Sequence, residues 1–182
     1  MAEKAQHQVI EEIRYSLNAR HINGFACGNN KAEPVLCLHG WLDNAASFTP
    51  LMTALPAELL SNKRFIAIEW PGHGQSSHRS ADAHYHFFDY VYDLLEIFEI
   101  NAWQSSGSEL ESSVESKTEQ GIDIIAHSMG AMVASAFAAA FPEKVKSLTL
   151  IDSLGFICSD AEESTSQLCK GMLSRLKIAQ VM

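Results

Sequence analysis

Short runs of apolar residues, separated by glycine, proline and polar turns, predict a series of strands along the chain. Apolar and polar positions alternate over residues 13–17, which is the period of a strand with one buried face. A second strand around Phe25 and Ala26, between Gly24 and Gly28, is expected to pair with the first as an antiparallel hairpin. Four continuous apolar runs follow, and such runs are typical of parallel strands covered on both faces. They lie at residues 34–38, 64–70, 122–126 and 148–152.

Segments with helical spacing alternate with these strands. Residues 87–98 carry one apolar stripe, and an alanine-rich helix is expected after Ser128. The predicted helices lie at residues 48–55, 87–98 and 131–140 and from about residue 160 onward. Strands that alternate with helices predict an α/β fold with a mainly parallel sheet flanked by helices.

A serine-rich acidic segment at residues 101–120 interrupts this pattern. It holds six serines, four glutamates and one lysine without periodicity, so we expect a flexible insertion. The 182 residues include 13 Lys and Arg against 22 Asp and Glu, a net charge of −9, and the insertion supplies 1 − 4 = −3 of it. The acidic balance argues against a nucleic-acid partner and against attachment to anionic membranes.

The cysteines and the N-terminal residues indicate in which cellular compartment the protein is expected. Cys27, Cys37, Cys158 and Cys169 show neither zinc-site nor C-x-x-C spacing. The first seven residues lack the apolar stretch of a signal peptide, and no apolar segment is long enough to span a bilayer. A reducing cytoplasmic location is therefore expected.

The segment Ala126-His127-Ser128-Met129-Gly130 joins a predicted buried strand to a predicted helix. A serine on such a sharp turn projects its hydroxyl above the sheet edge, and small residues two positions before and after it let the backbones approach closely. Ala126 and Gly130 meet that need. The alternative is that Ser128 only caps the following helix.

A second candidate segment follows the strand at residues 34–38. His39 and Gly40 open a loop there that can aim the backbone N–H of Trp41, together with that of Met129, at a developing oxyanion. His39, Gly40 and His127 are expected at the substrate pocket. The simpler alternative for His39 is that it hydrogen-bonds within its own loop, and the same holds for His73.

Several motifs in order resemble the α/β-hydrolase fold family, and within it the serine hydrolase-like subgroup. They are the segment from Leu36 to Phe48, the loop Pro71-Gly72-His73-Gly74-Gln75-Ser76-Ser77, the segment from Ala126 to Gly130, and the segments from Phe141 to Val145 and from Leu150 to Ser153. The resemblance covers nearly the whole chain apart from the insertion. It is specific for the fold and much less so for a substrate.

The resemblance implies a serine hydrolase that acts on a small ester-like substrate. Ser128 would be the nucleophile, backbone N–H groups of Trp41 and Met129 would hold the oxyanion, and an acyl-enzyme would form and be hydrolysed. No cofactor or metal is called for. The alternative is a non-catalytic binding protein of the same fold for small molecules.

The catalytic base is missing from the sequence. The family order is serine, acid, histidine, yet none of the eight histidines follows Ser128. Asp152, at the end of the strand after the nucleophile helix, is a candidate acid, although a carboxylate there often only caps the next segment.

The domain interpretation assigns residues 1–158 to the N-terminal part of the hydrolase core and residues 159–182 to the start of a helical cap. In the resemblance, further strand–helix units follow the start of the cap. We therefore expect the remaining C-terminal part of the same polypeptide to complete the fold and to supply the histidine.

Overall fold

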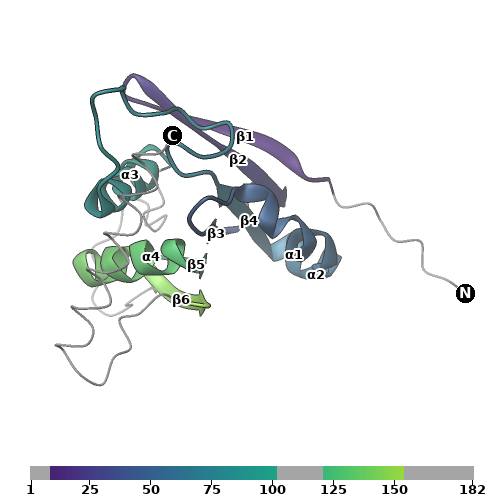
Figure 1. Ribbon diagram of the computed structural model, residues 1–182. Helices are drawn as coiled ribbons and strands as arrows, with labels where there is room; N and C mark the ends of the chain where they lie inside the picture. Colours follow the sequence, from purple (N-terminus) through teal and green to yellow (C-terminus); the bar gives the residue numbers. More distant parts are fainter. Residues whose placement is uncertain (1–8, 102–120, 154–182) are drawn as a thin grey trace, which may run out of the picture.

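The computed structural model describes residues 9–101 and 121–153. Its centre is a six-stranded sheet with the order β1-β2-β4-β3-β5-β6 (Figure 1). The strands are β1 (Glu11–Leu17), β2 (Arg20–Gly28), β3 (Glu33–Leu38), β4 (Lys63–Ile68), β5 (Ile122–His127) and β6 (Val145–Ile151). Strand β2 pairs antiparallel with β1 and with β4, whereas β4, β3, β5 and β6 pair in parallel. The prediction of a mainly parallel sheet is confirmed.

The N-terminal hairpin is longer than the sequence pattern indicates. Gly24 lies in the middle of β2 and does not mark its beginning, which corrects the predicted boundary. A Cβ at Gly24 would lie 2.1 Å from the carbonyl oxygen of Ala67 in β4. The glycine is therefore required by the close approach of two strands, while Gly28, at φ 98°, does end β2.

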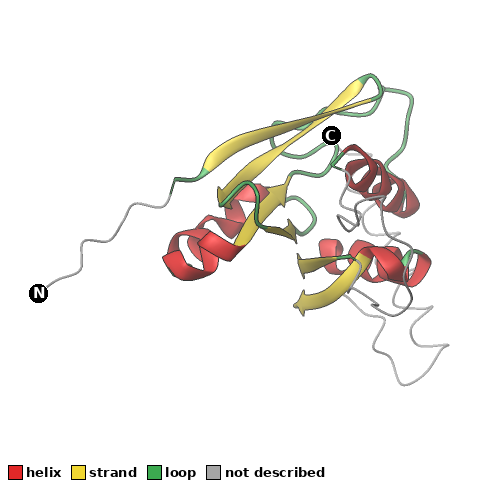
Figure 2. Ribbon diagram, turned by 180° about the vertical axis from the view of Figure 1, so that it is seen from behind, coloured by secondary structure: helices red, strands yellow, loops and turns green. Residues whose placement is uncertain are grey.

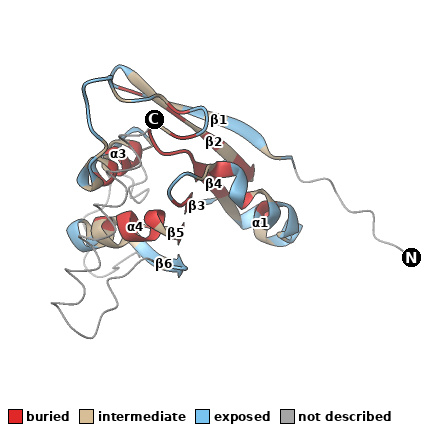
Figure 3. Cartoon of the chain, viewed as in Figure 1, coloured by how far each residue is buried: buried red, intermediate tan, exposed pale blue. Residues whose placement is uncertain are grey.

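Helices cover both faces of the parallel strands (Figure 2). Helices α3 (Phe87–Ile100) and α4 (Met129–Ala140) cover one face, where Leu36 and Leu38 of β3 join the larger apolar cluster. Val35 and Cys37 of the same strand point to the opposite face and join a second cluster. Both faces of β3 are thus buried (Figure 3), which explains its continuous apolar run.

The connection between β3 and β4 contains three short helical segments where the sequence predicts one helix at residues 48–55. They are the 3-10 helix η1 (Ala45–Phe48), α1 (Thr49–Ala54) and α2 (Ala57–Asn62). Pro56 does end the first helix, but it also stands at the N-cap of α2, because its fixed φ is compatible with a helix start. The sequence predicts only that Pro56 ends a helix, so its place at the start of α2 is an addition from the structure.

The segment after α4 differs slightly from the prediction. A short 3-10 helix, η2 (Pro142–Lys144), leads into β6, which begins at Val145 and so earlier than residue 148. The predicted insertion, apart from Asn101, lies outside the described residues, as do the predicted cap, Cys158 and Cys169. Cys27 and Cys37 are buried free thiols. Within the described ranges, no helix has the length and apolar character needed to cross a membrane.

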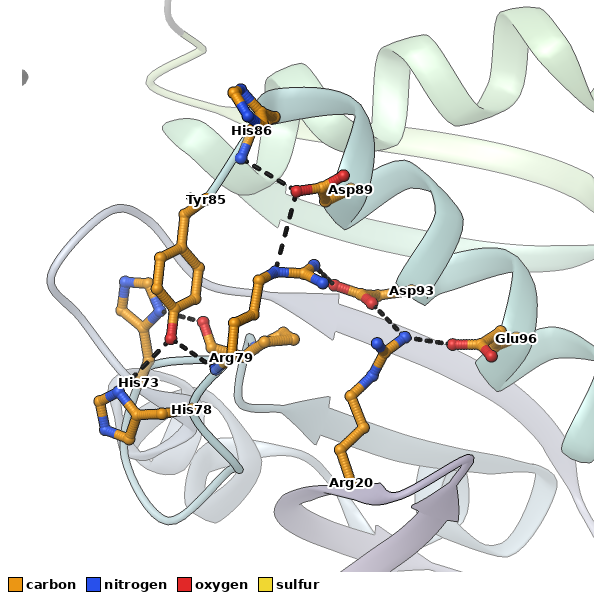
Figure 4. Close-up of polar contacts among 10 residues, drawn as sticks. Arg20, His73, His78, Arg79, Tyr85, His86, Asp89, Asp93 and Glu96 are labelled. Carbon is orange, nitrogen blue, oxygen red and sulfur yellow. Dashed lines mark hydrogen bonds and ion pairs between the residues drawn. The ribbon is translucent and has the colours of Figure 1, made fainter. Parts of the chain in front are cut away.

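A charged cluster ties the hairpin to α3 (Figure 4). Asp93 of α3 receives Arg20 Nη2 on one carboxylate oxygen and Arg79 Nη2 on the other, each at 2.6 Å. Glu96 pairs with Arg20, and Asp89 lies 3.9 Å from Arg79 Nε. The Asp93 side chain is only 1% exposed. We call these five residues the charged cluster.

Candidate active site

Ser128 occupies a strained turn between β5 and α4. Its backbone has φ 51° and ψ −114°, a conformation that costs a non-glycine residue on the order of 1–3 kcal/mol. Its side chain makes no capping hydrogen bond to α4, so the helix-cap alternative is not supported. The backbone N–H of Ser128 donates instead to the carbonyl oxygen of Ile151 at 3.0 Å. This geometry leaves the hydroxyl unused by the helix.

Close backbone contacts explain why small residues flank this turn. A Cβ at Gly130 would lie 2.5 Å from the carbonyl oxygen of Leu38, so a larger residue would push α4 away from the end of β3. A Cβ at Gly40 would lie 3.1 Å from the Ser128 Cβ atom. The loop after β3 and the serine turn are therefore in direct contact. Ala126, at the other flank, is fully buried.

The two predicted oxyanion donors lie on these touching segments. Met129 is the first residue of α4, where backbone N–H groups have no acceptor within the helix. Trp41 follows Gly40 directly and is 36% exposed as a residue. Leu42 after it has φ 57°, so the loop turns sharply at this point. The donor role of both N–H groups stays a prediction.

His39 lies inside the protein. Its side chain is fully buried, its Nδ1 is 2.7 Å from the Gly40 carbonyl oxygen, and its Nε2 accepts the Trp70 N–H at 3.1 Å. Burial lowers the pKa of His39 to about 4, against the opposing effect of the hydrogen bond to Gly40. With both ring nitrogens engaged, His39 has no free ring nitrogen for a substrate. Its Nδ1 contact lies within its own loop, as the simpler alternative predicts, but its Nε2 binds a residue that follows β4, which the sequence does not predict.

His73 is engaged in a similar way. Its Nδ1 lies 3.2 Å from the Pro71 carbonyl oxygen, and its Nε2 accepts the Leu42 N–H at 3.3 Å. Burial lowers its pKa as well. The ring packs edge-to-face against Trp41, with 5.5 Å between ring centroids.

His127 and Asp152 flank the serine turn from two strands. His127 is half-buried, and a Cβ at Gly40 would lie 3.1 Å from its Nδ1, so its ring adjoins the loop after β3. Asp152 is exposed, has φ 46°, and follows Ile151, the residue whose carbonyl receives the Ser128 N–H. Within the described residues, no group hydrogen-bonds the Asp152 carboxylate. The acid role of Asp152 and the pocket role of His127 stay predictions.

Glu69 is a supporting residue that the sequence reasoning missed. Its buried carboxylate accepts the Gln75 N–H at 2.6 Å, and Gly74, at φ 52°, passes so close that a Cβ there would lie 2.2 Å from the carboxyl carbon. The contact closes the loop that carries His73. A carboxylate at a strand end before Pro-Gly-x-Gly is the signal that could have indicated it.

A metal site finds no support in the part of the chain that the structure describes. No group of three His, Cys, Asp or Glu side chains could hold an ion there. His84 and His86, whose spacing is compatible with metal binding, lie with ring centroids 5.9 Å apart and without a third ligand.

The arrangement of strand, serine turn and helix agrees with comparisons against known proteins. Residues 35–176 match the alpha/beta hydrolase family. The chain belongs to this family. A serine hydrolase-like protein of Danio rerio is 34% identical over 170 residues, covering 93% of this chain and 46% of that protein. A serine hydrolase-like protein of Homo sapiens is 33% identical over 162 residues, covering 89% of this chain and 70% of that protein.

Solved structures give the same α/β-hydrolase fold. A hypothetical protein of Pseudomonas aeruginosa PAO1 superposes with a TM-score of 0.67 at 32% identity, covering 93% of this chain and 53% of that protein. A thioesterase domain from the curacin biosynthetic pathway superposes with a TM-score of 0.62 at 25% identity, covering 92% of this chain and 54% of that domain. The α/β-hydrolase chain described here thus spans about half the length of several of its relatives.

Proposed function

We propose that this protein is a serine hydrolase of small ester-like substrates, with Ser128 as its nucleophile. The observation that carries the proposal is the strained Ser128 backbone at a turn that touches the Gly40 loop, with the hydroxyl unused by α4. Strain of this kind persists only where the surrounding structure holds it, and it concentrates at functional sites.

The proposed reaction follows from this geometry. Ser128 Oγ attacks the carbonyl carbon of the ester while a base removes the hydroxyl proton, and the N–H groups of Trp41 and Met129 stabilise the oxyanion. The tetrahedral intermediate collapses, the alcohol leaves with the proton, and water then hydrolyses the acyl-enzyme. Asp152 is the candidate acid that would orient the base.

We propose that a further part of the same polypeptide supplies the base. No histidine follows Ser128, and both His39 and His73 have their ring nitrogens engaged by the backbone. The length of the relatives supports the proposal, since the chain covers 46% of the zebrafish protein. A general base contributes about 10²–10⁴-fold to such reactions, so the 182 residues alone are expected to be nearly inactive.

A fluorophosphonate probe tests the nucleophile directly. In a polypeptide that contains this sequence and extends to the end of the hydrolase fold, the probe is expected to label Ser128. Labelling should disappear in Ser128→Ala and persist in the control Ser135→Ala, whose hydroxyl only hydrogen-bonds a carbonyl of α4. A well-folded extended protein that is never labelled would contradict the proposal.

The second candidate function is a non-catalytic binding protein for small molecules. The observation that favours it is the absence of a histidine after Ser128. It predicts saturable binding of an ester or acid without turnover, measured by calorimetry, with affinity retained in Ser128→Ala. Turnover that depends on Ser128 would exclude it.

A further inference from the structure

Two loops at the carboxyl ends of β3 and β4 exchange hydrogen bonds through histidine rings. His39, after β3, accepts the N–H of Trp70 in the loop after β4, at 3.1 Å on Nε2. His73, in the loop after β4, accepts the N–H of Leu42 in the loop after β3, at 3.3 Å on Nε2. Each histidine thus binds a backbone donor of the other loop.

The other ring nitrogens fix the protonation state of both side chains. Nδ1 of His39 faces the carbonyl oxygen of Gly40, and Nδ1 of His73 faces that of Pro71. A carbonyl oxygen only accepts and a backbone N–H only donates, so Nδ1 must carry the proton and Nε2 must be bare. Both rings are therefore neutral and share one tautomer.

We propose that His39 and His73 are positioning residues that form a reciprocal histidine clasp, which holds the Trp41 loop against Ser128. The clasp itself rests on observed contacts, whereas its value for catalysis rests on the proposed function, in which the Trp41 N–H binds the oxyanion. Neither ring has a free nitrogen for Ser128, so neither serves as its base.

Leu42 shows why the loop needs such a clasp. Its φ of 57° is unfavourable for a branched apolar residue, and the residue is 75% exposed. Packing of this side chain therefore cannot hold the turn. The hydrogen bond from its N–H to His73, together with the His73 ring against Trp41, supplies the restraint.

The two rings also support one another. Their centroids lie 5.2 Å apart with an interplanar angle of 62°, and the Trp70 indole N–H donates to the His39 carbonyl oxygen at 3.0 Å. A shift of either loop would therefore disturb contacts in the other. The clasp behaves as one unit that joins the ends of neighbouring parallel strands.

Charged and titratable neighbours do not override the neutral state of the rings. The groups that act on His39 are Asp43, His73 and His127, and those that act on His73 are His78, Asp43 and Glu69. Burial is the largest influence on both, and it lowers the pKa of each histidine. Acidification would turn Nε2 into a donor that faces a backbone donor, and the clasp would open.

Nitrogen NMR of the 182-residue chain tests the clasp without any variant. The ring ¹⁵N shifts of His39 and His73 are expected to report a protonated Nδ1 and a bare Nε2 at pH 7. The same tautomer should persist at pH 6, because burial lowers the pKa of both histidines. A protonated Nε2 on either ring at pH 7 would overturn the proposal.

Amide hydrogen exchange then tests the link to Leu42. His73→Phe keeps a ring but removes the acceptor, so the Leu42 amide should exchange roughly tenfold faster, the size expected for one lost hydrogen bond. His73→Gln places an amide oxygen near the Nε2 position and should restore most of the protection. His84→Gln is the matched control and should change nothing. Equal Leu42 exchange in His73→Phe and the control would overturn the clasp.

Probe labelling of the extended polypeptide separates the clasp from the proposed function. If both hold, His73→Phe slows labelling of Ser128 by roughly 10²-fold or more while His73→Gln recovers much of the rate. Absence of labelling in every variant and in the wild type would refute the proposed function. Amide exchange of Leu42 would still show whether the clasp exists. Unchanged labelling in a His73→Phe protein that has lost Leu42 protection would refute the catalytic value of the clasp.

Discussion

The histidine clasp and the charged cluster are two buried polar assemblies that meet the same physical problem in different ways. His39 is fully buried and neutral, and both of its ring nitrogens are hydrogen-bonded. Asp93 is 1% exposed and paired with two guanidinium groups, yet Nε of Arg20 and Nε of Arg79 have no hydrogen-bond partner among the described residues. The clasp hydrogen-bonds all of its ring nitrogens, whereas the charged cluster leaves two buried nitrogens without a hydrogen bond.

The two assemblies also connect different parts of the chain. The clasp receives backbone N–H groups, which remain in place whatever side chain replaces the histidine. The charged cluster joins side chains only, from β2, from the loop before α3 and from α3 itself (Figure 4). We therefore expect substitutions and changes of pH to affect the two assemblies in opposite ways.

The largest effect is expected for Asp93→Ala. The substitution removes the buried carboxylate that two guanidinium groups share, and it leaves them only Glu96 and the more distant Asp89. Breaking a buried ion pair in this way typically costs about 3–5 kcal/mol. The free energy of unfolding, measured by urea denaturation at pH 7, should fall by that amount. Glu99→Ala, an exposed carboxylate on the same helix, is the control and should stay within about 0.5 kcal/mol of the wild type. Equal losses in the two variants would show that the cluster carries no special energy.

Acidification should act on the two assemblies with opposite sign. Because the pKa of His39 is about 4 in the folded protein and its ordinary value is 6.5, the unfolded chain binds the extra proton first as the pH falls. Its contribution to stability is complete above pH 6.5 and declines toward pH 4, on the order of 3 kcal/mol in all. Burial raises the pKa of Asp93 to about 6, so its protonation favours the folded state between pH 6 and pH 4.

Urea denaturation at pH 7, 6, 5 and 4.5 separates the two contributions. His39→Gln should flatten the decline of stability with acidification, and Asp93→Asn should steepen it. Three parallel curves for the wild type and these two variants would contradict the assignment of opposite signs.

A smaller effect is expected when Asp93 and the two arginines that it pairs with are replaced together by apolar residues. The free energy of unfolding of the triple variant Arg20→Met, Arg79→Met, Asp93→Leu should lie within about 1 kcal/mol of the wild-type value. The reason is that buried ion pairs rarely stabilise a protein more than well-packed apolar contacts of similar volume do. The corresponding double variant His39→Phe, His73→Phe should not be neutral, since it strands two backbone N–H groups. Denaturation of both at pH 7 gives the comparison, and a triple variant as unstable as Asp93→Ala would contradict it.

The sequence was sufficient for features that depend on local pattern. The continuous apolar runs predicted the parallel strands. The Ala126–Gly130 spacing predicted a close approach of backbones at the serine turn, and the structure shows that Gly130 makes this approach against the end of β3. These features follow from periodicity and from residue size within one segment. The serine turn could therefore be located before the tertiary structure was known.

Features that depend on register between distant segments could not be predicted in the same way. His39 was assigned to the substrate pocket or to a bond within its own loop, but its Nε2 contacts Trp70 on the neighbouring strand end. The charged cluster could not be predicted because Arg20, Arg79 and Asp93 belong to three segments that are separate in the sequence and meet only in the folded structure. The boundary predicted at Gly24 is wrong because the glycine is required by contact with a carbonyl oxygen of β4, a strand far away in the sequence.

The strand order determines which strands can pair first while the chain is being synthesised. Strands β1, β2, β4 and β3 can pair soon after Ile68 has emerged, but β3 keeps one edge open until β5 arrives with Ile122. Such distant parallel pairing is slow, because a long loop must close before any contact rewards it. The histidine clasp between the loops after β3 and β4 can therefore form early, before Ser128 is synthesised. A chain interrupted before Ser128 would already hold these two loops in place, but it would lack the serine turn that packs against them.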